Sequence, residues 1–354
     1  MDLSFLRTVY TPAAPVASLY MDVSRDREGA EQDIQARWDK AREDLASQGA
    51  DAETLGAMDQ VVGRGDGTAE PCGQLTFAAD GRVLFDRLVA DPSQDYTALW
   101  GPLPDPAPYL KRRGQHVPYV LVIVHSGGAA LRAVDASGQR HTERVGPGPG
   151  SNGAQPEADA GQIVAAIDRL AVGGGAETIV LAGEPEGRER VRNRLSEGLR
   201  LLAGDVETET GPSGPEGLPL DDELQRRLDE RAEEEQRTVA NAFEEGRGNP
   251  DRVTEGFAPV VYALRQGRVE TLVWSSGLAG GNAELWIGPY GEHLGLTEAE
   301  LHDMGVAEPV RANAEAALIR AAALTSAKLA FLPQHDVEPD EGLGAVLRNA
   351  EAHR

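Results

Sequence analysis

The chain has 354 residues, one cysteine, Cys72, and a formal net charge of -24. This length favours two or three domains of about 100 to 200 residues each. A single cysteine excludes a disulfide framework and any cysteine-based zinc site. The acidity argues against DNA as a partner. The first residues resemble no secretion signal and no apolar run reaches the ~20 residues of a membrane span, so we expect a cytoplasmic protein without a membrane partner.

The charge is unevenly distributed along the chain. Residues 101–150 contain six Lys and Arg against three Asp and Glu, whereas residues 201–250 contain fourteen Asp and Glu against five Arg. The basic segment is suited to an anionic partner, and the alternative is that the asymmetry serves solubility alone.

Residues 1–108 predict an α+β domain. Residues 17–23 alternate like a strand, and residues 28–47 have apolar side chains at helical spacing, among them Trp38, which we expect in the core. A hairpin is expected between residues 73 and 90. The proline-rich residues 104–108 predict a linker and the first domain boundary.

Residues 109–217 predict an α/β domain. The apolar run 119–125 predicts a strand that is buried on both faces, and a hairpin follows over residues 130–145. Residues 146–153 read Gly-Pro-Gly-Pro-Gly-Ser-Asn-Gly and predict a loop, because proline removes donors and glycine costs entropy to order. Residues 155–171 then predict a helix, and residues 178–183 a second buried strand.

The remaining segments are a charged connecting helix at 218–250 and a third domain at 251–354. In the third domain we expect helices at 252–266, 297–303 and 310–326 and strands at 269–275 and 327–332. Strands that alternate with helices again indicate an α/β sandwich.

Several kinds of chemistry are not indicated by the sequence. The loop at 146–153 lacks the Lys-Ser/Thr ending of a phosphate-binding loop, and Ser275 and Ser276 lack the glycines of a nucleophile elbow. The seven histidines form no pair at helical metal-binding spacing. We therefore expect no cofactor and no metal, and self-contained hydrolytic or redox catalysis has weak support.

Three stretches resemble a known family. Residues 252–273 look like the opening of the third domain of archaeal and eukaryotic class-one release factors and Pelota, and residues 327–348 resemble that domain's last strand, acidic turn and glycine-rich helix start. Residues 119–153 lie where the family's middle domain carries its peptidyl-transferase-centre loop. Residues 18–25 are similar to the first domain of the bacterial branch, the archaeo-eukaryotic release-factor-like proteins, which includes Rv2629-like and Balon-type ribosome hibernation factors.

The resemblance implies three domains. They are a diverged α+β N-terminal domain, an RNase H-like α/β middle domain with its loop at 141–155, and an α/β/α sandwich that resembles release-factor domain 3. In true release factors the loop carries Gly-Gly-Gln, which positions a water molecule against the peptidyl-tRNA ester. Here Gln155 follows the loop without a preceding Gly-Gly, so the loop departs from the termination motif.

The resemblance also implies a partner and a site. The partner would be the ribosome, with its 23S and 16S rRNA bound at the A site by a hibernation or stress factor, and the third domain would contact elongation factor Tu or a stalk-base protein. The expected RNA-binding residues are Lys111, Arg112, Arg113, Arg140, His141, Arg144, Gly146, Gly148, Gly150, Ser151, Asn152 and Gly153. The alternative is a peptidyl-tRNA hydrolase that rescues stalled ribosomes, with Gln155 placing the water.

Overall fold

The computed structural model describes residues 1–10, 14–64, 71–89, 92, 95–113, 117–147, 159–206, 218–275, 283–333 and 336–348. These residues form helices and several separate sheets, which confirms the predicted α/β class. The chain forms two compact units, one of residues 115–234 and one that combines residues 1–114 with residues 235–354. The predicted domain boundaries after residues 108, 217 and 250 stay predictions.

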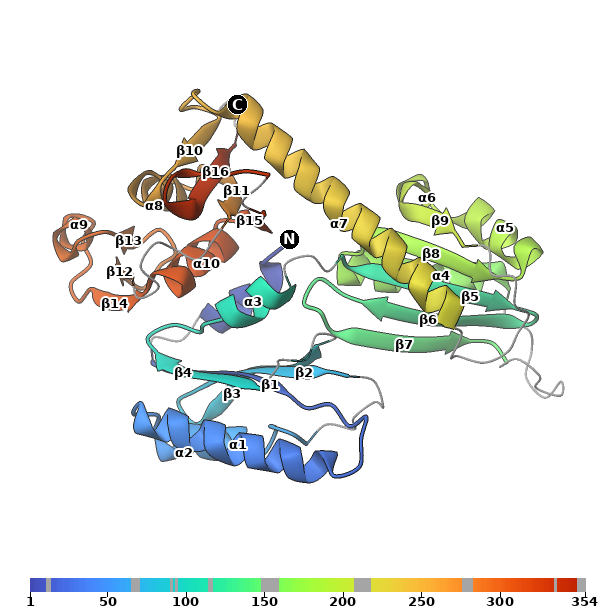
Figure 1. Ribbon diagram of the computed structural model, residues 1–354, viewed down its shortest axis with the longest axis horizontal. Helices are drawn as coiled ribbons and strands as arrows, with labels where there is room; N and C mark the ends of the chain where they lie inside the picture. The colour runs from blue at the N-terminus through green and yellow to red at the C-terminus, as the bar shows by residue number, and fades with distance from the viewer. Residues whose placement is uncertain are drawn as a thin grey trace. The chain divides into compact units, whose positions relative to one another are not determined.

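In the unit formed by the two chain ends, the N-terminal third is built on one antiparallel sheet with the strand order β3-β2-β1-β4 (Figure 1). One face of this sheet packs on α1 and α2 through Leu19, Met21 and the buried Trp38, which confirms that Trp38 belongs to the core. The proline-rich residues 104–108 lead directly into a helix, α3. The bounds in this third are η1 (Ser4–Tyr10), β1 (Val16–Asp22), α1 (Ala30–Ser47), α2 (Ala52–Met58), β2 (Gly73–Ala79), β3 (Arg82–Val89), β4 (Tyr96–Gly101) and α3 (Ala107–Arg113).

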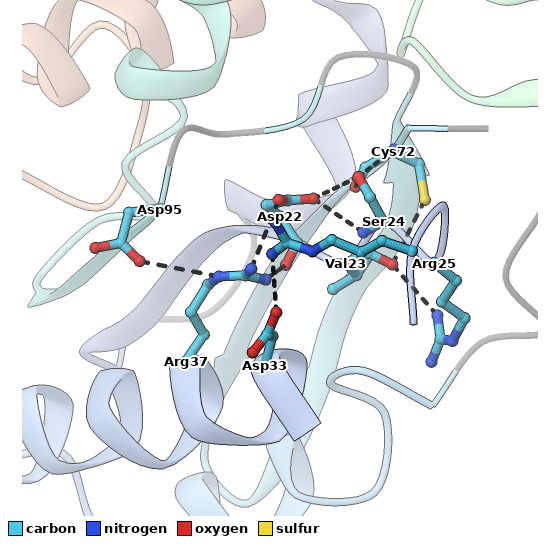
Figure 2. A network of polar contacts seen from close by, with 9 residues as sticks. Asp22, Val23, Ser24, Arg25, Asp33, Arg37, Cys72 and Asp95 are labelled. Atoms are coloured by element: carbon cyan, nitrogen blue, oxygen red, sulfur yellow. Dashed lines mark hydrogen bonds and ion pairs between the residues drawn. The ribbon is translucent and has the colours of Figure 1, made fainter. Parts of the chain in front are cut away.

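A polar network holds the carboxyl end of β1 against α1 and β2 (Figure 2). The Asp22 carboxylate accepts hydrogen bonds from the backbone N–H and the hydroxyl of Ser24, and the Cys72 N–H donates to Ser24 Oγ at 3.0 Å. Arg37 on α1 donates to the Asp22 carbonyl oxygen at 2.6 Å. The polar groups of this cluster are hydrogen-bonded to one another. The cluster therefore joins the end of β1 to α1 and to the start of β2, where Cys72 is buried.

The last third of the chain contributes two further sheets, with strand orders β10-β16-β11-β15 and β13-β12-β14. A single hydrophobic core joins it to the N-terminal third, with Leu6 and Phe77 in the same cluster as Leu272 and Leu318. The bounds are β10 (Val253–Glu255), α8 (Phe257–Arg265), β11 (Val269–Trp274), β12 (Glu284–Ile287), β13 (Leu294–Gly295), α9 (Glu298–Asp303), β14 (Val310–Asn313), α10 (Ala314–Leu324), β15 (Lys328–Phe331), η2 (Asp340–Gly342) and β16 (Leu343–Leu347).

Three predictions for this third were wrong. The predicted glycine-rich helix start near residue 343 is strand β16, whose Gly344 lies against the Phe243 ring. The predicted helix 310–326 begins with strand β14, because Asn313 caps α10 by accepting hydrogen bonds from two N–H groups of its first turn. Strand β10 likewise replaces the start of the predicted helix 252–266.

The other unit is a five-stranded sheet with the order β7-β6-β5-β8-β9. Helices α4 and α5 pack on one face through Ile163, Ile167 and Val191. Leu224 of α7 packs on the opposite face against Leu121, so β5 is buried on both faces as predicted. The bounds are β5 (Tyr119–His125), β6 (Gly128–Val134), β7 (Arg140–Val145), α4 (Ala160–Gly174), β8 (Thr178–Gly183), α5 (Pro185–Arg194), α6 (Glu197–Leu202), β9 (Ala203–Asp205) and α7 (Leu218–Gly246).

Candidate RNA-binding hairpin

Strands β6 and β7 form the antiparallel hairpin that leads into the predicted loop. Its turn is fixed by Asp135, whose Oδ1 accepts hydrogen bonds from Ser137 N–H at 2.8 Å and Gln139 N–H at 3.0 Å. Gly138 in this turn has a φ of 84°, a conformation that favours glycine. The turn therefore sets the register of both strands.

The register divides the predicted cations of β7 between the two faces of the sheet. His141 Nε2 donates to the Asp135 carboxylate at 2.8 Å, and Glu143 forms an ion pair of 2.5 Å with Arg169 of α4, so these two side chains lie on the α4 face. Arg140 and Arg144 alternate with them and lie on the other face. The structure therefore does not bring His141 together with the two arginines.

Arg132 is a further residue of this face that the prediction of site residues missed. It pairs across the hairpin with Thr142, between the positions of Arg140 and Arg144. Diagonal neighbours in an antiparallel pair lie about 7–8 Å apart, within reach of one polyanion. Strand alternation on both sides of the Asp135 turn could have identified Arg132 from the sequence.

The Asp135 carboxylate remains ionised in spite of its partial burial. Burial alone would raise its pKa, but hydrogen bonds from the Ser137 hydroxyl, from His141 and from two backbone N–H groups outweigh that effect and lower the pKa. The negative charge of Asp135 thus faces His141 and holds that imidazole against the turn.

The predicted cations of α3 belong to the other unit, and their surroundings differ from those of the hairpin. Lys111 Nζ lies 2.5 Å from the Glu315 carboxylate and 5.6 Å from the centre of the Trp274 ring. Its charge is therefore compensated inside the protein. Arg112 is exposed on α3, and the side chain of Arg113 lies outside the described residues.

The loop itself can be followed only at its first residues. Gly146 follows β7 with a φ of 82°. Gly128, at the start of β6, has no room for a side chain, because a Cβ there would lie 2.1 Å from the Val145 carbonyl oxygen. The remaining predicted residues of this loop lie outside the described residues: Gly148, Gly150, Ser151, Asn152, Gly153 and the weak catalytic candidate Gln155.

The topology places the stem of the loop at a common site for ligands. Strands β5 and β8 are parallel neighbours, and the chain continues from β5 to β6 on one side and from β8 to β9 on the other, so their carboxyl ends mark a topological switch point. Strand β7 runs in the same direction and ends at this edge. Helix α4 begins there too, with its first turn held by a capping box between Asp159 and Gln162.

Within the residues that the structure describes, no group of three or more His, Cys, Asp or Glu side chains is arranged to hold a metal ion. None of the helices in this part of the chain is long and apolar enough to cross a bilayer.

The comparison with protein families confirms the resemblance seen in the sequence. Residues 118–249, which include the hairpin, match the model of Bacterial archaeo-eukaryotic release factor family 2. The matched segment contains every strand of the five-stranded sheet and all of α7.

Two relatives align with almost the whole chain. Uncharacterized protein Rv2629 of Mycobacterium tuberculosis strain H37Rv is 25% identical over 375 residues, which cover 99% of this chain and 97% of the relative. Uncharacterized protein MT2704 of strain CDC 1551 matches with the same values.

Solved structures of low sequence identity are also similar. One, described as a model of ribosome-bound archaeal Pelota and ABCE1, is 14% identical, covers 98% of this chain and 94% of its own, and has a TM-score of 0.42. Dom34 of S. cerevisiae is 11% identical, covers 80% of this chain and 82% of its own, and has a TM-score of 0.41.

Proposed function

We propose that this protein is a cytoplasmic ribosome-binding factor that occupies the vacant A site without hydrolysing peptidyl-tRNA. The observation that carries the proposal is the position of three arginines, Arg132, Arg140 and Arg144, on one face of the hairpin whose second strand leads into the predicted peptidyl-transferase-centre loop. Arginine binds phosphate oxygens in bidentate fashion and independently of base sequence, as contacts to ribosomal RNA require.

The loop sequence determines which activity is proposed. Residues 146–153 contain no Gly-Gly-Gln, and glycines without that glutamine allow the backbone to approach RNA closely but supply no side chain that positions water. A factor of this kind blocks the A site and the peptidyl-transferase centre during hibernation or stress. The third domain would contact a protein partner such as elongation factor Tu.

Competition on 70S ribosomes tests this function. Wild-type protein is expected to bind ribosomes with a vacant A site and to be excluded when aminoacyl-tRNA fills that site. The variant Arg144→Glu should weaken binding by about tenfold through the loss of one phosphate contact and repulsion by the new charge. Arg82→Glu, the same change at an exposed arginine of the other unit, is the matched control.

The peptidyl-tRNA hydrolase alternative gives a different result in a release assay. Ribosomes loaded with labelled peptidyl-tRNA should keep their peptide when the factor is added. Release by the wild type that is lost in Gln155→Ala would establish the hydrolase instead. Equal binding to ribosomes with filled and vacant A sites would contradict A-site occupancy.

A further inference from the structure

Helix α5 carries four arginines at every second position, Arg188, Arg190, Arg192 and Arg194. Its buried stripe includes Gly187 and Val191, which pack toward the sheet. At 100° per residue, Arg188 and Arg192 fall on one flank of that stripe, and Arg190 and Arg194 fall on the opposite flank.

The two arginines of the first flank are paired with a carboxylate of the protein. Arg192 Nη2 lies 2.8 Å from the Asp205 carboxylate, and Arg188 Nη1 lies 3.9 Å from it. Arg188 also donates to the Val206 carbonyl oxygen at 3.2 Å. These two arginines fasten α5 to the end of β9 and are partly or fully buried.

The second flank has no such partner. Arg190 and Arg194 are exposed, and neither forms an ion pair or a side-chain hydrogen bond with any residue in the described part of the chain. Glu186 stands four residues before Arg190, a spacing that permits an ion pair, yet no ion pair joins them. Two like charges four residues apart on a helix repel each other, so the placement of both arginines on one flank costs stability.

Arg194, on the second flank, lies near the start of α4, the helix that follows the loop. A Cβ built on Gly161 would lie 3.9 Å from Arg194 Nη1 and 3.0 Å from Asp159 Oδ1. The Asp159 carboxylate is committed to the N-cap of α4, where it accepts the Gln162 N–H at 2.8 Å. The Arg194 guanidinium therefore lies beside the loop stem, without an ion pair to any residue that the structure describes.

We propose that Arg190 and Arg194 form a second phosphate-binding site, which grips the RNA backbone beside the loop stem. The proposal rests on the ribosome-binding function above and assigns to α5 a contact separate from that of the hairpin. Two arginines at i and i+4 spacing suit adjacent phosphates of one strand, because each guanidinium can hold two oxygens of one phosphate.

The double variant Arg190→Glu/Arg194→Glu tests the site by binding to 70S ribosomes at several salt concentrations. Its matched control is Arg82→Glu/Lys328→Glu, with the same change of charge at two exposed positions of the other unit. Loss of two phosphate contacts should weaken binding at least about tenfold and flatten the slope of log affinity against log salt by roughly 1 to 2. The control should retain wild-type affinity and slope.

A photocrosslinker in place of the exposed Asn193, between the two arginines in sequence, identifies the partner. Crosslinks to ribosomal RNA are expected, and crosslinks confined to ribosomal protein would overturn the site. Wild-type affinity and slope in the α5 variant would overturn it while leaving the proposed function intact. Failure of the wild type to bind ribosomes would instead overturn the function, and the site with it.

Discussion

Asp135 determines the conformation of the hairpin at the level of single residues. Its carboxylate accepts hydrogen bonds from Ser137 and Gln139 and faces His141 at 2.8 Å. Because the turn fixes the register between β6 and β7, Asp135 indirectly aligns Arg140 and Arg144 with Arg132. Asp135 contacts no RNA in the proposed function, yet it determines that the three arginines lie side by side on one face of the hairpin.

The variant Asp135→Asn should lower the free energy of unfolding by about 1–3 kcal/mol at pH 7, because it removes the charged acceptor of several hydrogen bonds. The lowered pKa means that this stabilisation is present above the unfolded value of about 3.9 and is lost as pH falls through the folded pKa. Urea unfolding at pH 7 and at pH 3 measures both effects. A variant that loses equal stability at both pH values would contradict this role.

Asp105 shows the opposite behaviour in the other unit. Burial and the nearby Glu315 carboxylate raise its pKa, against the lowering effects of the Ala107 N–H and Lys111. For a raised carboxyl pKa, stability is fully present below the unfolded value and is lost as pH rises through the folded pKa. The ionised Asp105 therefore costs stability at neutral pH.

Replacement of Asp105 by asparagine should preserve or raise the melting temperature at pH 7, because asparagine keeps an oxygen for the Ala107 N–H without the buried charge. The advantage over the wild type should shrink as pH falls toward 4. Differential scanning calorimetry across this range measures it. A large loss of stability at pH 7 would show that the Asp105 charge is needed for folding.

At the scale of elements, α7 is anchored by different residues in its two halves. Leu224 packs on the five-stranded sheet, whereas Phe243 is fully buried against β16 in the unit of the chain ends. A Cβ on Gly344 would lie 2.5 Å from the Phe243 ring. The absence of a side chain at residue 344 is therefore what admits the phenyl group.

A double-mutant cycle tests this packing. Phe243→Ala should cost about 3–5 kcal/mol through the cavity it leaves, and Gly344→Ala should cost about 1–3 kcal/mol through overpacking. In the double variant the new methyl group enters the space that the ring vacated. The double variant should therefore be less destabilised than the sum of the single variants, and strict additivity in denaturant unfolding would refute the contact.

The sequence predicted elements well where local signals agreed. The apolar run of β5 and the Asp-Ala-Ser-Gly turn of the hairpin were visible in it, as was the charged helix α7. It failed at β14, because the apolar spacing from Val310 onward continued through Asn313 and hid the cap that begins α10. The prediction failed at β16 because this glycine-rich stretch was assigned to a helix start from the family resemblance. The stretch is a strand because it pairs with β10 and β11, whose residues lie about 70 to 90 positions earlier in the chain.

The candidate site was only partly predictable for a related reason. The local excess of basic residues pointed to Arg140 and Arg144, but a count of charge does not separate His141 from them, which strand alternation does. Glu186 and Glu189 lie on the same helix as the four arginines of α5, so a count of charge along the chain shows only part of their positive charge. Only the packing of α5 shows that one pair is neutralised by Asp205 and the other is not.

At the scale of the whole molecule, the two ends of the chain form one unit with a shared core. Leu6 and Val9 of η1 lie in the same hydrophobic cluster as Leu318 of α10, and Arg7 donates to the Ala323 carbonyl oxygen at 2.9 Å. The N-terminal third therefore stabilises the C-terminal third, and the two should unfold together.

The variant Leu6→Ala should lower the stability of this unit by about 2–5 kcal/mol through loss of a fully buried side chain. Hydrogen exchange followed by mass spectrometry should then show parallel loss of protection in β1 and β11, with β5 protected as in the wild type. Protection lost in β1 alone would show that the ends of the chain fold independently.

In the proposed function, residues 146–153 reach the peptidyl-transferase centre of the ribosome while the hairpin binds RNA beside it. A photocrosslinker in place of Ser151 tests this placement, with the same group in place of Arg82 as control. Crosslinks are expected from position 151 to the peptidyl-transferase region of 23S rRNA, and they should disappear when aminoacyl-tRNA fills the A site. Crosslinks that fall elsewhere on the ribosome, or that persist with the A site filled, would contradict it.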